Sequence, residues 1–180
     1  MYAADRQAKG FNAALLMSVQ PVMNARGPRD RTQDEGFAVG FEDPADGYLN
    51  ELKVDYVQYL DGLFALLVEH EIVPVPQSVF HGFWWKASTC GTKVPPAEYA
   101  RYCRYLVARY GARPMVYLVV AHGSGEKPQI AAGGKEVSEW DAYGQLTGVH
   151  NPPRTVTTAR TRTRIGWTSS GGRPVTAAST

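Results

Sequence analysis

His122 is the residue of this 180-residue sequence best placed for acid–base chemistry. It directly follows a continuous apolar segment, residues 115–121, and precedes a glycine-rich turn. An imidazole titrates near neutral pH, so it can donate or accept a proton. An unbroken apolar run of this kind is typical of a buried parallel strand, and in parallel α/β proteins the chemistry lies where such strands end. The pattern therefore predicts that His122 faces a site.

The elements that must position this histidine alternate along the chain. Apolar runs predict strands at residues 11–19, 72–80, 115–121 and 146–150, the last of which ends in His150. Helical spacing of apolar residues predicts helices at residues 52–71 and 96–110, together with the end of a helix at residues 2–9 and a short helix at residues 136–143. Pro74 and Pro76 are unusual for a central strand, since they lack backbone donors.

Strict alternation of helices and buried strands predicts βαβ units and a parallel sheet. The segments after the strands are long, whereas the joins from helix to strand are short, as in a barrel whose active face is built from the βα loops. We therefore predict an α/β fold, a partial (β/α)8 TIM barrel of about four βα units. An open doubly wound sheet is the alternative, but no Gly-x-Gly-x-x-Gly motif follows the first strand.

Composition excludes several classes of protein. No apolar run approaches the ~20 residues of a membrane-spanning helix, and Met1 is not followed by the features of an export signal. We expect no membrane association and, for the chain as it stands, a cytoplasmic location. Cys90 and Cys103 form no metal-binding or disulfide pattern, so no cofactor and no metal are expected.

Four blocks of sequence carry a resemblance to a known family. They are residues 2–12 (YAADRQAKGFN), 55–61 (DYVQYLD), 79–83 (VFHGF) and 99–110 (YARYCRYLVARY). Together they resemble the apiosidase-like glycoside hydrolases, formerly a domain of unknown function, whose TIM-barrel catalytic domain is often followed by a domain named as collagen-binding. The resemblance runs from residue 2 to about residue 150.

The resemblance implies that an aspartate should stand where this sequence has His122. The family's strand at this place ends in Gly-Gly-Asp or Gly-Ala-Asp, and this chain reads Val120-Ala121-His122. Glycosidases need one group to protonate the leaving oxygen and a second carboxylate as nucleophile or base. An imidazole differs from a carboxylate in shape and charge, so impaired catalysis is expected. By resemblance the second carboxylate comes from a later strand, which this chain does not reach.

Side chains that follow the strands are the expected sugar ligands. Amide, guanidinium and imidazole groups can hydrogen-bond sugar hydroxyls or carboxylates, and exposed aromatic faces can stack on pyranose rings. Solvated loops, or packing over the barrel rim, are the alternatives. The expected substrate-binding residues are Gln20, Asn24, Arg26, His81, Trp84, Trp85, Lys86 and His150.

The last thirty residues differ from the rest of the chain. Residues 151–180 hold five arginines and no acid, and their few bulky apolar residues predict disorder. Read in a shifted frame, the codons of residues 162–180 can encode a tract similar to the family's own. We therefore expect a TIM-barrel domain at residues 1–150 and a frameshifted, disordered tail at residues 151–180.

Two functions are consistent with this sequence. The first is a fragment of an apiosidase-like glycoside hydrolase that acts on plant-type polysaccharide side chains and is catalytically impaired. The second is a non-catalytic carbohydrate-binding protein. Nucleic-acid binding would depend on the basic tail alone and ranks last, so the expected partner is carbohydrate. Unpaired edge strands predict self-association in addition.

Overall fold

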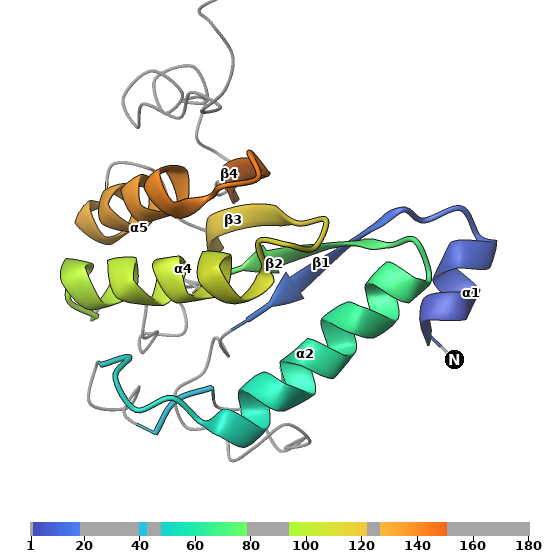
Figure 1. The fold of residues 1–180 in the computed structure, drawn as a ribbon, viewed down its shortest axis with the longest axis horizontal. Coiled ribbons are helices and arrows are strands. Elements are labelled where there is room, and N and C mark those ends of the chain that lie inside the picture. Colours follow the sequence, from blue (N-terminus) through green and yellow to red (C-terminus); the bar gives the residue numbers. More distant parts are fainter. Residues whose placement is uncertain (1, 19–39, 43–47, 79–93, 122–126, 151–180) are drawn as a thin grey trace, which may run out of the picture.

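The computed structural model describes residues 2–18, 40–42, 48–78, 94–121 and 127–150. Helices and strands alternate along these residues, as the sequence predicted (Figure 1). The order is α1 (Tyr2–Ala8), β1 (Ala13–Met17), α2 (Val54–Glu69), β2 (Val73–Gln77), α4 (Pro96–Tyr110), β3 (Val116–Ala121), α5 (Pro128–Trp140) and β4 (Leu146–His150). Within these ranges no helix combines the length and the apolar character needed to cross a membrane.

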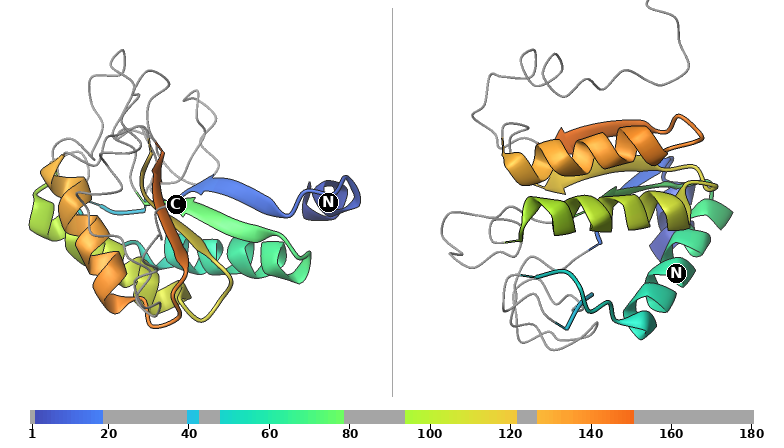
Figure 2. Two further views of the ribbon diagram at one scale, coloured as in Figure 1. Left: turned by 90° about the horizontal axis from the view of Figure 1, so that it is seen from above. Right: turned by 60° about the vertical axis from the view of Figure 1, so that its left-hand side comes forward.

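The four strands form one parallel sheet in the order β1-β2-β3-β4. Figure 2 shows α2, α4 and α5 on the same face of this sheet. A doubly wound sheet reverses its strand order and carries helices on both faces, whereas a barrel keeps neighbouring strands in sequence and places every helix outside. The predicted partial barrel of four βα units is therefore confirmed, and the doubly wound alternative is wrong.

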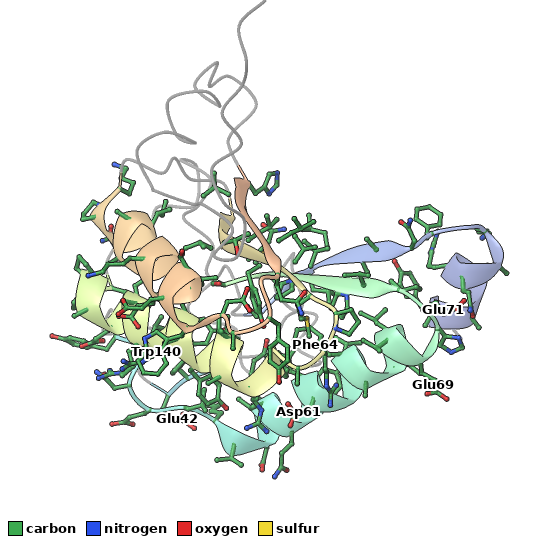
Figure 3. The ribbon with its side chains drawn as sticks, turned by 45° about the horizontal axis from the view of Figure 1, so that its top comes forward. Glu42, Asp61, Phe64, Glu69, Glu71 and Trp140 are labelled. Carbon is green, nitrogen blue, oxygen red and sulfur yellow. The ribbon has the colours of Figure 1, made fainter. Side chains whose placement is uncertain are left out.

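The hydrophobic core lies between the sheet and its helices. Phe64 points from α2 toward the sheet (Figure 3) and is fully buried, with its ring 4.7 Å from that of Tyr110 in an edge-to-face arrangement. Burying a side chain of this size stabilises the fold by about 1.5–3 kcal/mol. The other large core side chains come from every layer of the structure: Leu60, Tyr99, Leu106, Tyr117, Val119, Ile130 and Val137.

The helix predicted at residues 136–143 is longer and begins earlier than the sequence indicated. The pair Gly133-Gly134 suggested a loop, but both residues lie inside α5 and are buried. A Cβ atom added at Gly133 would lie 2.8 Å from the Sγ atom of Cys103 and 3.0 Å from the ring of Tyr99. Glycine is therefore present because α4 and α5 pack closely at this point, and it does not interrupt the helix.

The two prolines of β2 lie in a strand with neighbours on both sides. The amide of Val73 donates to the carbonyl of Asn12 beside β1, and the amide of Ser78 donates to the carbonyl of Leu118 in β3. Because the direction of backbone groups alternates along a strand, the missing donors of Pro74 and Pro76 are on the side of β3. A central strand thus tolerates them, and β2 pairs with β3 near its end, at Gln77 and Leu118.

Candidate functional site

The carboxyl ends of the four strands lie at one edge of the sheet, because all the strands are parallel. Ser18 follows β1, Gln77 ends β2 and is followed by Ser78, and His150 ends β4. β3 ends at Ala121, directly before His122. The edge at which the sequence predicted a site is therefore lined by polar residues.

Ser18 fixes the end of β1. Its amide donates to the carbonyl of Gln77 (3.1 Å), and its Oγ atom lies 2.8 Å from the same oxygen. The Ser18 carbonyl in turn accepts hydrogen bonds from the hydroxyls of Tyr56 (2.9 Å) and Tyr102 (3.3 Å). Since Ser18 is buried and fully engaged with the protein, its role is to hold the strand end in place.

Ser78 and Tyr99 fix the ends of β2 and β3 in a similar way. The amide of Ser78 donates to the carbonyl of Leu118 (3.0 Å), and its hydroxyl lies 3.4 Å from that oxygen. The hydroxyl of Tyr99 donates to the carbonyl of Val119 (2.5 Å) from the helix side. These hydrogen bonds tie the end of β2 to β3, and β3 to the helix α4.

The inner face of the sheet is the face without helices. Tyr117 and Val119 of β3 are buried against the helices, so the alternate residue Leu118 points to the inner face. Leu118 is in register with Gln77 on one side and with Gly148 on the other. Gln77 therefore lies on the inner face, and so does His150, two residues beyond Gly148.

Gln77 and His150 meet on this inner face across β3. The Nδ1 atom of His150 lies 3.2 Å from the Oε1 atom of Gln77, although the two residues are 73 positions apart. Gln77 is only 4% exposed, whereas His150 is exposed. In a barrel, inward side chains of alternate strands lie in the same layer. Since β2 and β4 are alternate strands, the contact between Gln77 and His150 fits such a layer.

Titratable groups on the helix side are held neutral by burial. Burial raises the pKa of the Tyr56 and Tyr102 hydroxyls, so both remain hydrogen-bond donors. Burial also raises the pKa of the Cys103 thiol to about 12, which excludes it as a thiolate nucleophile near neutral pH. No group of three or more histidine, cysteine or acidic side chains in the described part of the chain could hold a metal ion.

A pocket lies on the helix side of the strand end rather than on the inner face. It is bounded by Ser18, Phe41 and the tyrosines 56, 102 and 110. Tyrosine rings and apolar side chains fill most of its wall, and the hydroxyls of Tyr56 and Tyr102 already bond to Ser18. The pocket therefore belongs to the packing that supports the strand end.

Of the nine predicted site residues, His150 is the one within the described residues. The other eight lie outside the described residues: Gln20, Asn24, Arg26, His81, Trp84, Trp85, Lys86 and His122. The sequence did not indicate Gln77 as a site residue. The strand was predicted to continue to residue 80, which would place Gln77 within the strand and away from its end. The position of Gln77 directly after Pro76, as a polar residue in an otherwise apolar strand, is the sequence signal that could have identified it.

Comparisons with known proteins bear on the family and the fold of this chain. The family model "Apiosidase-like, catalytic domain" matches residues 1–171, beyond residue 150 where the resemblance was expected to stop. The division into a domain at residues 1–150 and a frameshifted tail stays a prediction, which sequencing the gene downstream of the His150 codon would test. No curated protein matches the chain significantly.

Two solved structures from Bacteroides vulgatus ATCC 8482 share the fold. One is a glycoside hydrolase family 5 protein, with 16% identity, a TM-score of 0.59, and coverage of 86% of this chain and 31% of that chain. The other, assigned as a glycoside hydrolase, has 17% identity, a TM-score of 0.60, and coverage of 85% and 32%. The present chain thus spans about a third of the length of these proteins.

Proposed function

The chain belongs to the apiosidase-like family of glycoside hydrolase catalytic domains, and from this premise we propose that it acts on plant-type polysaccharide side chains with impaired turnover. The sugar would bind at the carboxyl ends of the strands, on the inner face. The observation that supports this location is the Gln77–His150 contact, which places two polar side chains on a sheet face that is otherwise largely apolar.

The residue types at the strand ends support the proposal of impaired turnover. Hydrolysis of a glycosidic bond requires a proton donor and a carboxylate that acts as nucleophile or base. The described strand ends carry serine, glutamine and histidine side chains and no carboxylate. By resemblance, His122 takes the place at which the family has an aspartate, so the carboxylate and its negative charge would be missing there.

The same lack of a carboxylate favours a second candidate, a carbohydrate-binding protein without turnover. Hydrolysis of an aryl glycoside and of branched pectin separates the two. The first candidate predicts slow turnover that His122→Asp increases by up to about 10²-fold, the lower end of the range of general acid–base catalysis, because the change restores one of the two catalytic groups. Measurable turnover that His122→Asp leaves unchanged would contradict the role given to this position. Binding of pectin oligosaccharides with no turnover by either protein would establish the second candidate.

Aromatic contacts with the sugar can be tested with a matched control. We expect that changing Trp84 and Trp85 to alanine weakens binding of pectin oligosaccharides in calorimetric titrations. Trp140 is a suitable control because it is 54% exposed at the far end of α5, where its ring contacts the Arg104 guanidinium at 5.3 Å (Figure 3). If the change of both Trp84 and Trp85 to alanine has no larger effect than Trp140→Ala, a binding role for Trp84 and Trp85 is contradicted.

We also expect the chain to self-associate, and the exposed apolar side chains on the inner face of the sheet support this expectation. Leu15 of β1 and Leu146 of β4 are 55% and 73% exposed there, and no described strand pairs with the outer edge of β1 or β4. A second copy that covers this face would remove apolar surface from water. Sedimentation velocity should then reveal dimers that Leu146→Lys dissociates and that Val54→Lys, on exposed α2 surface, leaves intact. A monomer at all concentrations would refute it.

A further inference from the structure

Gln77 is an unusual residue for its position. The preceding inner-face positions of β2 are Val73 and Val75, and the glutamine that follows them is 4% exposed. Burying an amide is costly unless it forms hydrogen bonds, so a buried glutamine at an apolar position needs a polar partner. The partner here is the ring of His150, on a strand that is not adjacent to β2.

The chemistry of this contact fixes the tautomer of His150. The Oε1 atom of Gln77 is a carbonyl oxygen and can only accept a hydrogen bond, so the Nδ1 atom of His150 must carry the proton. In the neutral imidazole one nitrogen is a donor and the other an acceptor. The contact therefore makes Nε2 of His150 the acceptor. An acceptor at an exposed strand end is suited to a hydroxyl donor such as those of a sugar.

We propose that Gln77 is a positioning residue, which holds His150 as the Nδ1–H tautomer so that its Nε2 atom accepts a hydrogen bond from a sugar hydroxyl. The part of this inference that concerns the sugar rests on the proposed function. The part that concerns the tautomer rests on the Gln77–His150 contact alone. Either part can be wrong while the other is right, so the tautomer and the sugar binding must be measured in separate experiments.

Long-range ¹H–¹⁵N correlation spectra of the histidine rings read the tautomer directly. The sequence has four histidines, and His150→Gln identifies the resonances of His150 by their loss. With the ring neutral, we expect a protonated Nδ1 and an unprotonated Nε2 in the natural sequence. Gln77→Leu should shift the ring toward the Nε2–H tautomer, while Gln77→Glu keeps an acceptor and should retain the Nδ1–H tautomer. Gln58→Leu, on the exposed surface of α2, is the control and should change nothing.

Binding of pectin oligosaccharides then tests the sugar contact. Losing one hydrogen bond should weaken binding roughly 3- to 10-fold in His150→Phe, which has no acceptor, and in Gln77→Leu. Gln77→Glu should bind as the natural sequence does. An Nε2–H tautomer in the natural sequence would overturn the inference, whatever the binding data. If the Nδ1–H tautomer is found but His150→Phe binds the oligosaccharides normally, the positioning contact is supported and the proposed sugar contact is wrong.

Discussion

Adding a single methyl group at Gly133 would test how closely α4 and α5 pack against each other. It lies inside α5, where a Cβ atom would approach the Sγ atom of Cys103 to 2.8 Å and the ring of Tyr99 to 3.0 Å. Both neighbours are buried side chains of α4 with no exposed surface into which they could move. Gly133→Ala should therefore push α4 and α5 apart and destabilise the domain.

Two opposing effects set the size of the change. Replacing glycine by alanine inside a helix stabilises the folded state by about 0.5–1 kcal/mol. Overpacking a well-packed core costs about 1–3 kcal/mol. We expect the steric effect to dominate, so that Gly133→Ala lowers the free energy of unfolding by about 1–2 kcal/mol. Gly62, inside α2 with no atom within 4 Å of an added Cβ, has the helix-propensity effect alone. Gly62→Ala should therefore raise the same free energy by up to about 1 kcal/mol.

Urea denaturation measures both variants against the natural sequence. The midpoint should fall for Gly133→Ala and rise for Gly62→Ala, with an unchanged dependence of free energy on urea concentration. The cost of Gly133→Ala should be smaller in a Cys103→Ala background, because the closest contact is then removed. A Gly133→Ala variant as stable as Gly62→Ala would refute the close approach of α4 and α5.

Two further predictions concern polar contacts. Gln145→Leu should lower the free energy of unfolding by about 2–3 kcal/mol in urea denaturation, because the Gln145 amide bonds three backbone groups of residues 111–115 at the start of β3; a loss no larger than that of a surface variant would contradict this. The Arg109 guanidinium lowers the pKa of Asp61. The stabilisation from this pair should be complete above the unfolded pKa near 3.8 and should decline as pH falls through the lower folded value. Thermal melts between about pH 2 and pH 7 should show Asp61→Asn removing this decline and Asp55→Asn leaving it; identical profiles for the two variants would contradict the assignment.

Local sequence patterns were sufficient to predict most of the elements. The helix predicted at residues 96–110 and the strand predicted at residues 146–150 have the observed bounds. In α2, periodic apolar residues located the helix to within two residues at each end. These patterns are reliable because each element must bury one face, and burying one face requires apolar residues at regular spacing within that element.

Patterns failed where a residue's role depends on a distant neighbour. The glycine pair of α5 suggested a loop, since the close contact of Gly133 with α4 cannot be read from spacing along the chain. The prolines of β2 argued against a central strand because the direction of their missing donors depends on which strand lies on each side. In both cases tertiary contacts overrode a correct local tendency.

The candidate site, like the fold, was predicted only in part by the sequence. The sequence alone placed histidines at the ends of three predicted strands, namely His81, His122 and His150. It also predicted that a parallel arrangement would bring those strand ends to one edge. Only the tertiary structure decided that His150 meets Gln77, since that contact depends on the register of three strands and on which face each residue takes. Register is set by packing across the whole sheet, so no local pattern in a single sequence specifies it.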